Sequence, residues 1–65
     1  MTKAEKRERA EELRNELDRL QNSSAARSEW IHDAIAWMGY SRKHAENALL
    51  KHMTFLQATI NLYSK

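Results

Sequence analysis

Cysteine and proline are absent from the 65-residue sequence, and glycine occurs once, at position 39. Without cysteine, the chain cannot form disulfide bonds or bind a metal through thiolates. Proline and glycine are the residues that most strongly interrupt helices, so their scarcity leaves long stretches that can stay helical. The residues that predominate, chiefly alanine, leucine, glutamate, lysine and arginine, favour helices as well, and we predict an all-α fold.

Long apolar runs are also missing. No stretch approaches the roughly 18 consecutive apolar residues of a membrane span, and residues 1–9 are too charged to hold the apolar region of a secretory signal. We therefore expect a cytoplasmic protein without a membrane partner. A chain of this length buries only a modest core, so its stability depends on efficient helix packing, on self-association or on a larger partner.

Residues 1–22 are predicted to form a charged amphipathic helix. Thr2 and Glu5 match a capping box at its start. Opposite charges recur at four-residue spacing, which stabilises a solvated helix, in the pairs Glu5/Arg9, Arg7/Glu11 and Arg14/Asp18. A narrow apolar seam, too short for an independent coiled coil, consists of Ala10, Leu13, Leu17 and Leu20. Because the first nine residues have little to bury, we expect the N-terminal half to project into solvent or along a partner. The leucines of the seam can pack either on the rest of the domain or on a partner.

Residues 23–28 are predicted to be a short polar linker, because the stretch Gln21-Asn22-Ser23-Ser24 is the only polar, turn-prone cluster in the chain. Asn22 can end the first helix, and either Ser24 or Ser28 can cap the next one. Residues 29–65 would then form a small bundle of two or three helices around the corner at Gly39.

The helix predicted for residues 28–38 is apolar around more than half of its circumference. One stripe, the expected core face, consists of Ile31, Ala34, Ile35 and Met38. A second stripe beside it consists of Trp30, Ala34 and Trp37. A helix of this kind either is central to the fold or contacts a partner as well as the core.

The stretch Trp37-Met38-Gly39-Tyr40-Ser41 is predicted to form a tight corner between two helices. Gly39 stands where a left-handed residue commonly ends a helix, and Tyr40 can supply the apolar contact that accompanies such an ending. Ser41 can then cap the following helix.

Two alternatives remain for residues 41–63. A capping box at Thr54 would divide the segment into two short helices. An apolar stripe that runs on to Tyr63, with no glycine, proline or asparagine at the supposed break, favours one long helix.

We expect neither catalysis nor a cofactor. The histidines have no cysteine to accompany them and no acidic residue four positions away; they are His32, His44 and His52. His44 and His52 stand two helical turns apart, too far to share one metal ion. A chain with one glycine also cannot form a glycine-rich phosphate loop.

Protein binding accounts better for the many aromatic and methionine side chains. A core of this size cannot easily enclose all of them, and such residues are enriched at the centres of interfaces. The alternative is that they form the core of a three-helix bundle. The candidate protein-binding residues are Leu13, Leu17, Leu20, Trp30, Trp37, Met38, Gly39, Tyr40 and Tyr63.

The corner resembles the ubiquitin-associated (UBA) domain. Met38-Gly39-Tyr40 is similar to the Met-Gly-Phe/Tyr loop of that family, and the helix after it has the matching residues Ala45, Ala48 and Leu49. Residues 31–53 resemble more specifically the UBA-like domain of the huntingtin-interacting protein K family, in which a charged helix comes first. They resemble more distantly that of the alpha subunit of the nascent-polypeptide-associated complex.

This resemblance implies a three-helix fold, with a break near Thr54, and a non-enzymatic adaptor. The implied partner of Met38, Gly39 and Tyr40 is ubiquitin or a ubiquitin-like protein. Relatives in the huntingtin-interacting protein K family dock instead on the ribosome-associated N-terminal acetyltransferase and restrain it.

The sequence therefore favours a protein-interaction module that docks through its apolar corner onto a larger protein or complex. A second hypothesis is a small oligomeric structural or assembly protein, of a virus or mobile element, that self-associates through the leucine seam and the aromatic helices. The third is a helix-turn-helix DNA-binding regulator, because the helix after the corner begins Arg42-Lys43-His44. Glu46 interrupts that basic face, so nucleic acid is the partner we expect least.

Overall fold

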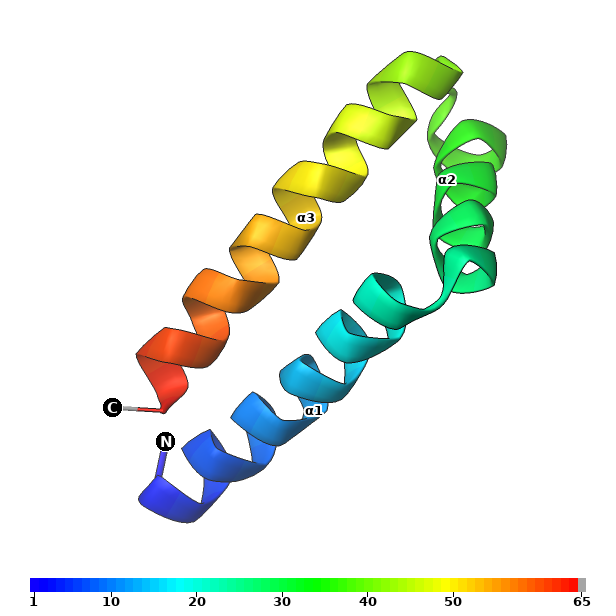
Figure 1. The fold of residues 1–65 in the computed structure, drawn as a ribbon. Helices are drawn as coiled ribbons and strands as arrows, with labels where there is room; N and C mark the ends of the chain where they lie inside the picture. The colour runs from blue at the N-terminus through cyan, green and yellow to red at the C-terminus, as the bar shows by residue number, and fades with distance from the viewer. Residues whose placement is uncertain (65) are drawn as a thin grey trace.

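The computed structural model describes residues 1–64 of the chain, which contain three α-helices. They are α1 (Lys3–Asn22), α2 (Ser24–Met38) and α3 (Arg42–Tyr63), and the predicted all-α class is confirmed. In Figure 1, α1 and α3 run antiparallel beside each other, so the start of α1 lies beside the end of α3. The corner between α2 and α3 lies at the opposite end of a molecule that measures 39 × 19 × 16 Å.

No helix within residues 1–64 has the length and apolar character that crossing a membrane requires.

Hydroxyl side chains cap the start of all three helices. The backbone N–H of Glu5 donates to Thr2 Oγ1 at 3.1 Å, that of Ala26 to Ser23 Oγ at 3.1 Å, and that of His44 to Ser41 Oγ at 3.2 Å. Each bond satisfies a backbone donor that has no partner inside its helix. The predicted caps at Thr2 and Ser41 are confirmed, whereas the cap of α2 is Ser23 rather than Ser24 or Ser28.

The polar segment 23–28 is not a linker. Apart from Ser23, which is extended, these residues form the first turns of α2. Two alanines within the segment favour a helix. The guanidinium of Arg27 donates from Nη1 to the carbonyl oxygens of Leu20 (2.8 Å) and Gln21 (2.9 Å), so it satisfies acceptors at the end of α1. One non-helical residue therefore suffices to separate the two helices.

All three helices contribute to one core. Its buried members are Leu13, Leu17, Leu20, Ala26, Leu49, Leu56 and Ile60, and Trp30, Ile31, Met53 and Tyr63 pack against it. Ala10 is buried as well. The expectation that the N-terminal half of α1 projects is wrong, because α1 lies along α3 as far as Lys3, which shares a groove with Tyr63.

The third helix continues without a break through Thr54. The Thr54 hydroxyl donates to the Leu50 carbonyl oxygen at 3.0 Å, one turn earlier, instead of capping a new helix. Thr59 donates in the same way to the carbonyl oxygen of Phe55 at 2.8 Å. The single-helix alternative is confirmed, and the break near Thr54 that the UBA resemblance implies is absent.

Candidate interaction surface at the apolar corner

Gly39 sets the direction of the corner. Its backbone is left-handed, with φ 69° and ψ 21°, as predicted for a residue that ends a helix. A Cβ atom built on Gly39 would meet nothing within 4 Å, so the conformation alone, and not crowding, favours glycine. Ser41 caps α3 two residues later, which keeps the turn short.

Trp37 and Met38 protrude from the end of α2. The Trp37 side chain is 85% exposed and Met38 is 63% exposed. Tyr40 is half-buried, because its ring packs against that of His44 with 4.2 Å between the ring centroids. We call Trp37, Met38 and Tyr40 the apolar corner.

A cleft of about 470 Å³ lies beside the apolar corner, between α2 and the start of α3. Its apolar lining comes from Ile31 and Ile35, and its polar lining from Ser28, Glu29, His32 and Arg42. Ile31, Ile35 and Met38 share one stripe of α2. The prediction that Ile35 and Met38 lie on the core face of this helix is wrong, because both side chains are exposed. The surface thus combines two protruding apolar side chains with a hollow.

The two tryptophans of α2 have different surroundings although they stand seven residues apart on one face. Trp30 is half-buried and stacks on His52, with the ring centroids 5.4 Å apart. Leu20 at the end of α1 lines a small pocket with Trp30. Because α1 meets α2 at Ser23, the far end of α2 extends beyond α1, as Figure 1 shows. Trp37 belongs to the last turn of α2 and remains 85% exposed.

The predicted protein-binding residues fall into separate places. Trp37, Met38, Gly39 and Tyr40 form the corner, whereas Leu13, Leu17 and Leu20 are buried in the core and present no surface to a partner. Trp30 packs at the junction of the three helices. Tyr63 is half-buried at the opposite end of the molecule, where the chain ends meet.

Three apolar side chains on α3 were not among the predicted site residues but are exposed. They are Leu50 at 64%, Phe55 at 63% and Leu62 at 65%. Phe55 and Leu62 stand seven residues apart and so share one side of the helix. Their position off the stripe of Leu49, Leu56 and Ile60 was visible in the sequence and would have identified them.

Two of the three histidines make side-chain contacts. His52 Nε2 lies 3.3 Å from Glu16 Oε1 on α1, while its ring stacks on Trp30 of α2, so it joins all three helices. His44 packs against Tyr40. Within residues 1–64, no three histidine or acidic side chains are placed to hold a metal ion.

Comparisons of the chain with protein-family models, with curated proteins and with solved structures find no significant match.

Proposed function

We propose that this chain is a protein-interaction module that docks onto a larger protein through the apolar corner, and that it acts by binding rather than by catalysis. The observation that carries the proposal is the exposure of Trp37 and Met38, the last two residues of α2, in a chain whose core is formed by other residues. Tryptophan and methionine are enriched at interface centres, and tryptophan is a frequent hot spot.

The apolar area at the corner is large enough to matter for binding. Burial of one tryptophan removes roughly 200 Å² from water, worth about 5 kcal/mol at about 25 cal/mol per Å² before the costs of association. A partner side chain can enter the neighbouring cleft, whose apolar lining consists of Ile31 and Ile35. The corner therefore offers a tryptophan that a partner can bury and a cleft that can accept a side chain of the partner.

The experiment is affinity purification of the full-length chain with quantitative mass spectrometry, repeated with Trp37→Ala. Leu50→Ala is the matched control, because Leu50 is also highly exposed but lies on α3 and is not part of the apolar corner. We expect the partner to be lost with Trp37→Ala and retained with Leu50→Ala. Equal recovery from both variants would rule the corner out as the docking site.

Ubiquitin is the first partner to test, because Met38-Gly39-Tyr40 resembles the ubiquitin-binding loop of UBA domains. The proposal depends on the corner and not on a shared fold, since α3 is continuous where a UBA domain begins its third helix. We expect ubiquitin to shift the amide signals of residues near Gly39. If only residues elsewhere shift, this partner class is wrong.

Self-association is a second candidate function, supported by Phe55 and Leu62 on one exposed side of α3. It cannot use the leucine seam while the fold is intact, because Leu13, Leu17 and Leu20 are buried against α3. Light scattering in the micromolar range distinguishes the two functions. A dimer that Phe55→Ser disrupts would favour self-association, and a constant monomer mass would exclude it.

A further inference from the structure

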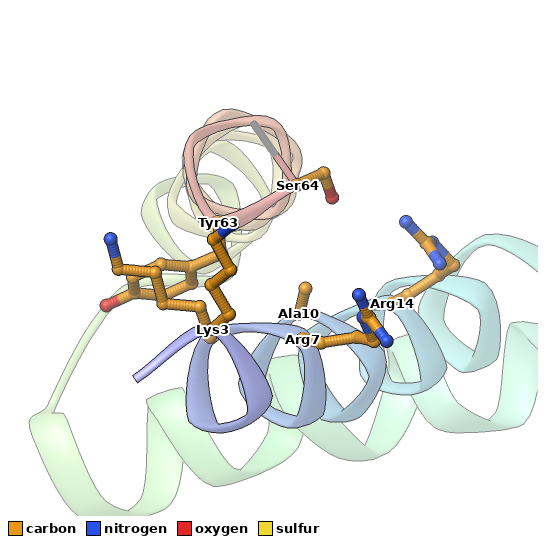
Figure 2. A pocket seen from close by; sticks show the side chains of 7 residues that line it. Lys3, Arg7, Ala10, Arg14, Tyr63 and Ser64 are labelled. Carbon is orange, nitrogen blue, oxygen red and sulfur yellow. The ribbon is translucent and has the colours of Figure 1, made fainter. Parts of the chain in front are cut away.

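A basic groove lies at the end of the molecule opposite the apolar corner. It occupies about 470 Å³ between the first turns of α1 and the end of α3, and its lining residues are Lys3, Lys6, Arg7, Ala10, Arg14, Tyr63 and Ser64. Figure 2 shows Ala10 in the middle, with Lys3 and the Tyr63 ring on one side and Arg7 and Arg14 on the other. Two helices distant in sequence thus build one concave surface.

The lining of the basic groove contains four cationic residues and no acidic one among residues 1–64. The whole chain has eleven basic and nine acidic residues, so the remainder holds seven basic against nine acidic and is net negative. The last turn of α3 adds a partial negative charge of about half an elementary charge, which offsets only a small part of the four. Positive charge is therefore concentrated in the basic groove, although α1 as a whole carries equal numbers of basic and acidic residues.

Arg7 and Arg14 face this groove although each has an acidic residue one turn later. Neither Arg7 with Glu11 nor Arg14 with Asp18 forms an ion pair within residues 1–64, contrary to the sequence prediction. The ion pair within α1 is instead Arg9–Glu12 at 3.1 Å. The guanidinium groups of Arg7 and Arg14 are therefore open to an external carboxylate.

The length of the cationic row indicates the chemistry of the ligand. Lys3, Arg7 and Arg14 lie along one side of α1, and at 1.5 Å per residue the row extends over roughly 16 Å. A single small anion requires donors that converge on one point, whereas a peptide with several carboxylates can pair along a row. The phosphates of a duplex nucleic acid would also lie close to the net-negative remainder of this small chain. The repulsion between them opposes binding.

We propose that the basic groove is a second interaction site, which binds an acidic segment of a partner protein. Its position at the chain ends, far from the apolar corner, makes it independent of the docking function proposed above. Arginine pairs with carboxylates through two parallel hydrogen bonds, so Arg7 and Arg14 provide the principal contacts, and the lysines add charge.

The test uses an alanine-based peptide with glutamates spaced three and four residues apart, titrated into the isotope-labelled full-length chain. We expect amide shifts at Lys3 to Arg14 and at Tyr63, none at Gly39, and an affinity that falls as salt rises. The double variant Arg7→Gln/Arg14→Gln should bind about tenfold more weakly, since it removes two exposed charge pairs. The matched control is Arg9→Gln/Arg19→Gln, which removes the same charge from another side of α1 and should bind within about twofold of the original.

Circular dichroism of both double variants verifies that the helices are intact, as expected for changes at exposed positions. The proposal is overturned if both variants lose the same affinity, or if the glutamine version of the peptide binds equally well. Tighter binding of inorganic phosphate or of a DNA duplex than of the acidic peptide would also overturn it.

Discussion

Gly39 ends α2 and redirects the chain, because its backbone adopts a left-handed conformation. Its φ of 69° is the only positive value within residues 1–64. An L-residue with a Cβ in this region is strained by about 1–2 kcal/mol. No neighbouring atom lies within 4 Å of the added Cβ, so crowding adds nothing to this strain in Gly39→Ala.

We therefore expect Gly39→Ala to lower the free energy of unfolding by about 1–2 kcal/mol, as measured by urea denaturation followed by circular dichroism. Gly39→Asn should cost less, because asparagine tolerates the left-handed region. An alanine variant as stable as the original chain would show that the left-handed corner is not required.

Leu17 is buried in the core, although the sequence also allowed it to face a partner. Leu17→Ala should cost about 2–5 kcal/mol, the range for leucine truncation in cores. A core this small rarely supplies more than about 3–5 kcal/mol, so the variant should be largely unfolded at room temperature. Leu62→Ala is the control with little expected loss, because Leu62 is exposed. Circular dichroism compares the two variants, and retained helicity in Leu17→Ala would contradict its core position.

At the scale of helices, the sequence predicted the end of a helix correctly wherever a single nearby residue was suited to cap it. Thr2, Gly39 and Ser41 occupy the predicted cap positions. The start of α2 could not be located in this way, because four serines and asparagines compete within the segment from Asn22 to Ser28. A tertiary contact favours the observed start: Arg27, in the first turns of α2, donates to the carbonyl groups that end α1.

The cap of α2 gives a test of this helix start. Ser23→Ala removes the hydroxyl that accepts from the Ala26 backbone N–H and should cost about 1 kcal/mol. The neighbouring change Ser24→Ala lies inside the helix at an exposed position and should be neutral or slightly stabilising. Thermal unfolding followed by circular dichroism measures both, and the reverse order would place the cap at Ser24.

The faces of the helices were predicted less well than their ends. Periodicity identified the stripes of α2, but it could not show that α1 stops short of Trp37 and leaves it without cover. Periodicity likewise could not distinguish a leucine seam that faces a partner from one that faces α3. The basic groove is invisible in the sequence, because its residues come from both ends of the chain.

At the scale of the whole molecule, the elongated shape separates two surfaces of different character. The apolar corner stands at one end and the basic groove at the other, along a long axis of 39 Å. The exposed side chains of the two surfaces, Trp37 and Met38 at one end and the cationic residues at the other, lie outside the core, so they can change without loss of the fold. Trp37→Ala should accordingly change the free energy of unfolding by less than about 0.5 kcal/mol, as measured by urea denaturation.

The central claim, that the apolar corner contacts a partner protein, is tested most directly by site-specific photo-crosslinking in the full-length chain. A benzoylphenylalanine in place of Trp37 should give a discrete adduct with one protein, and the same group in place of Gln21, an exposed residue of α1, should not. Loss of the adduct in a chain that also carries Met38→Ser would strengthen the assignment. Adducts at position 21 with none at position 37 would contradict it.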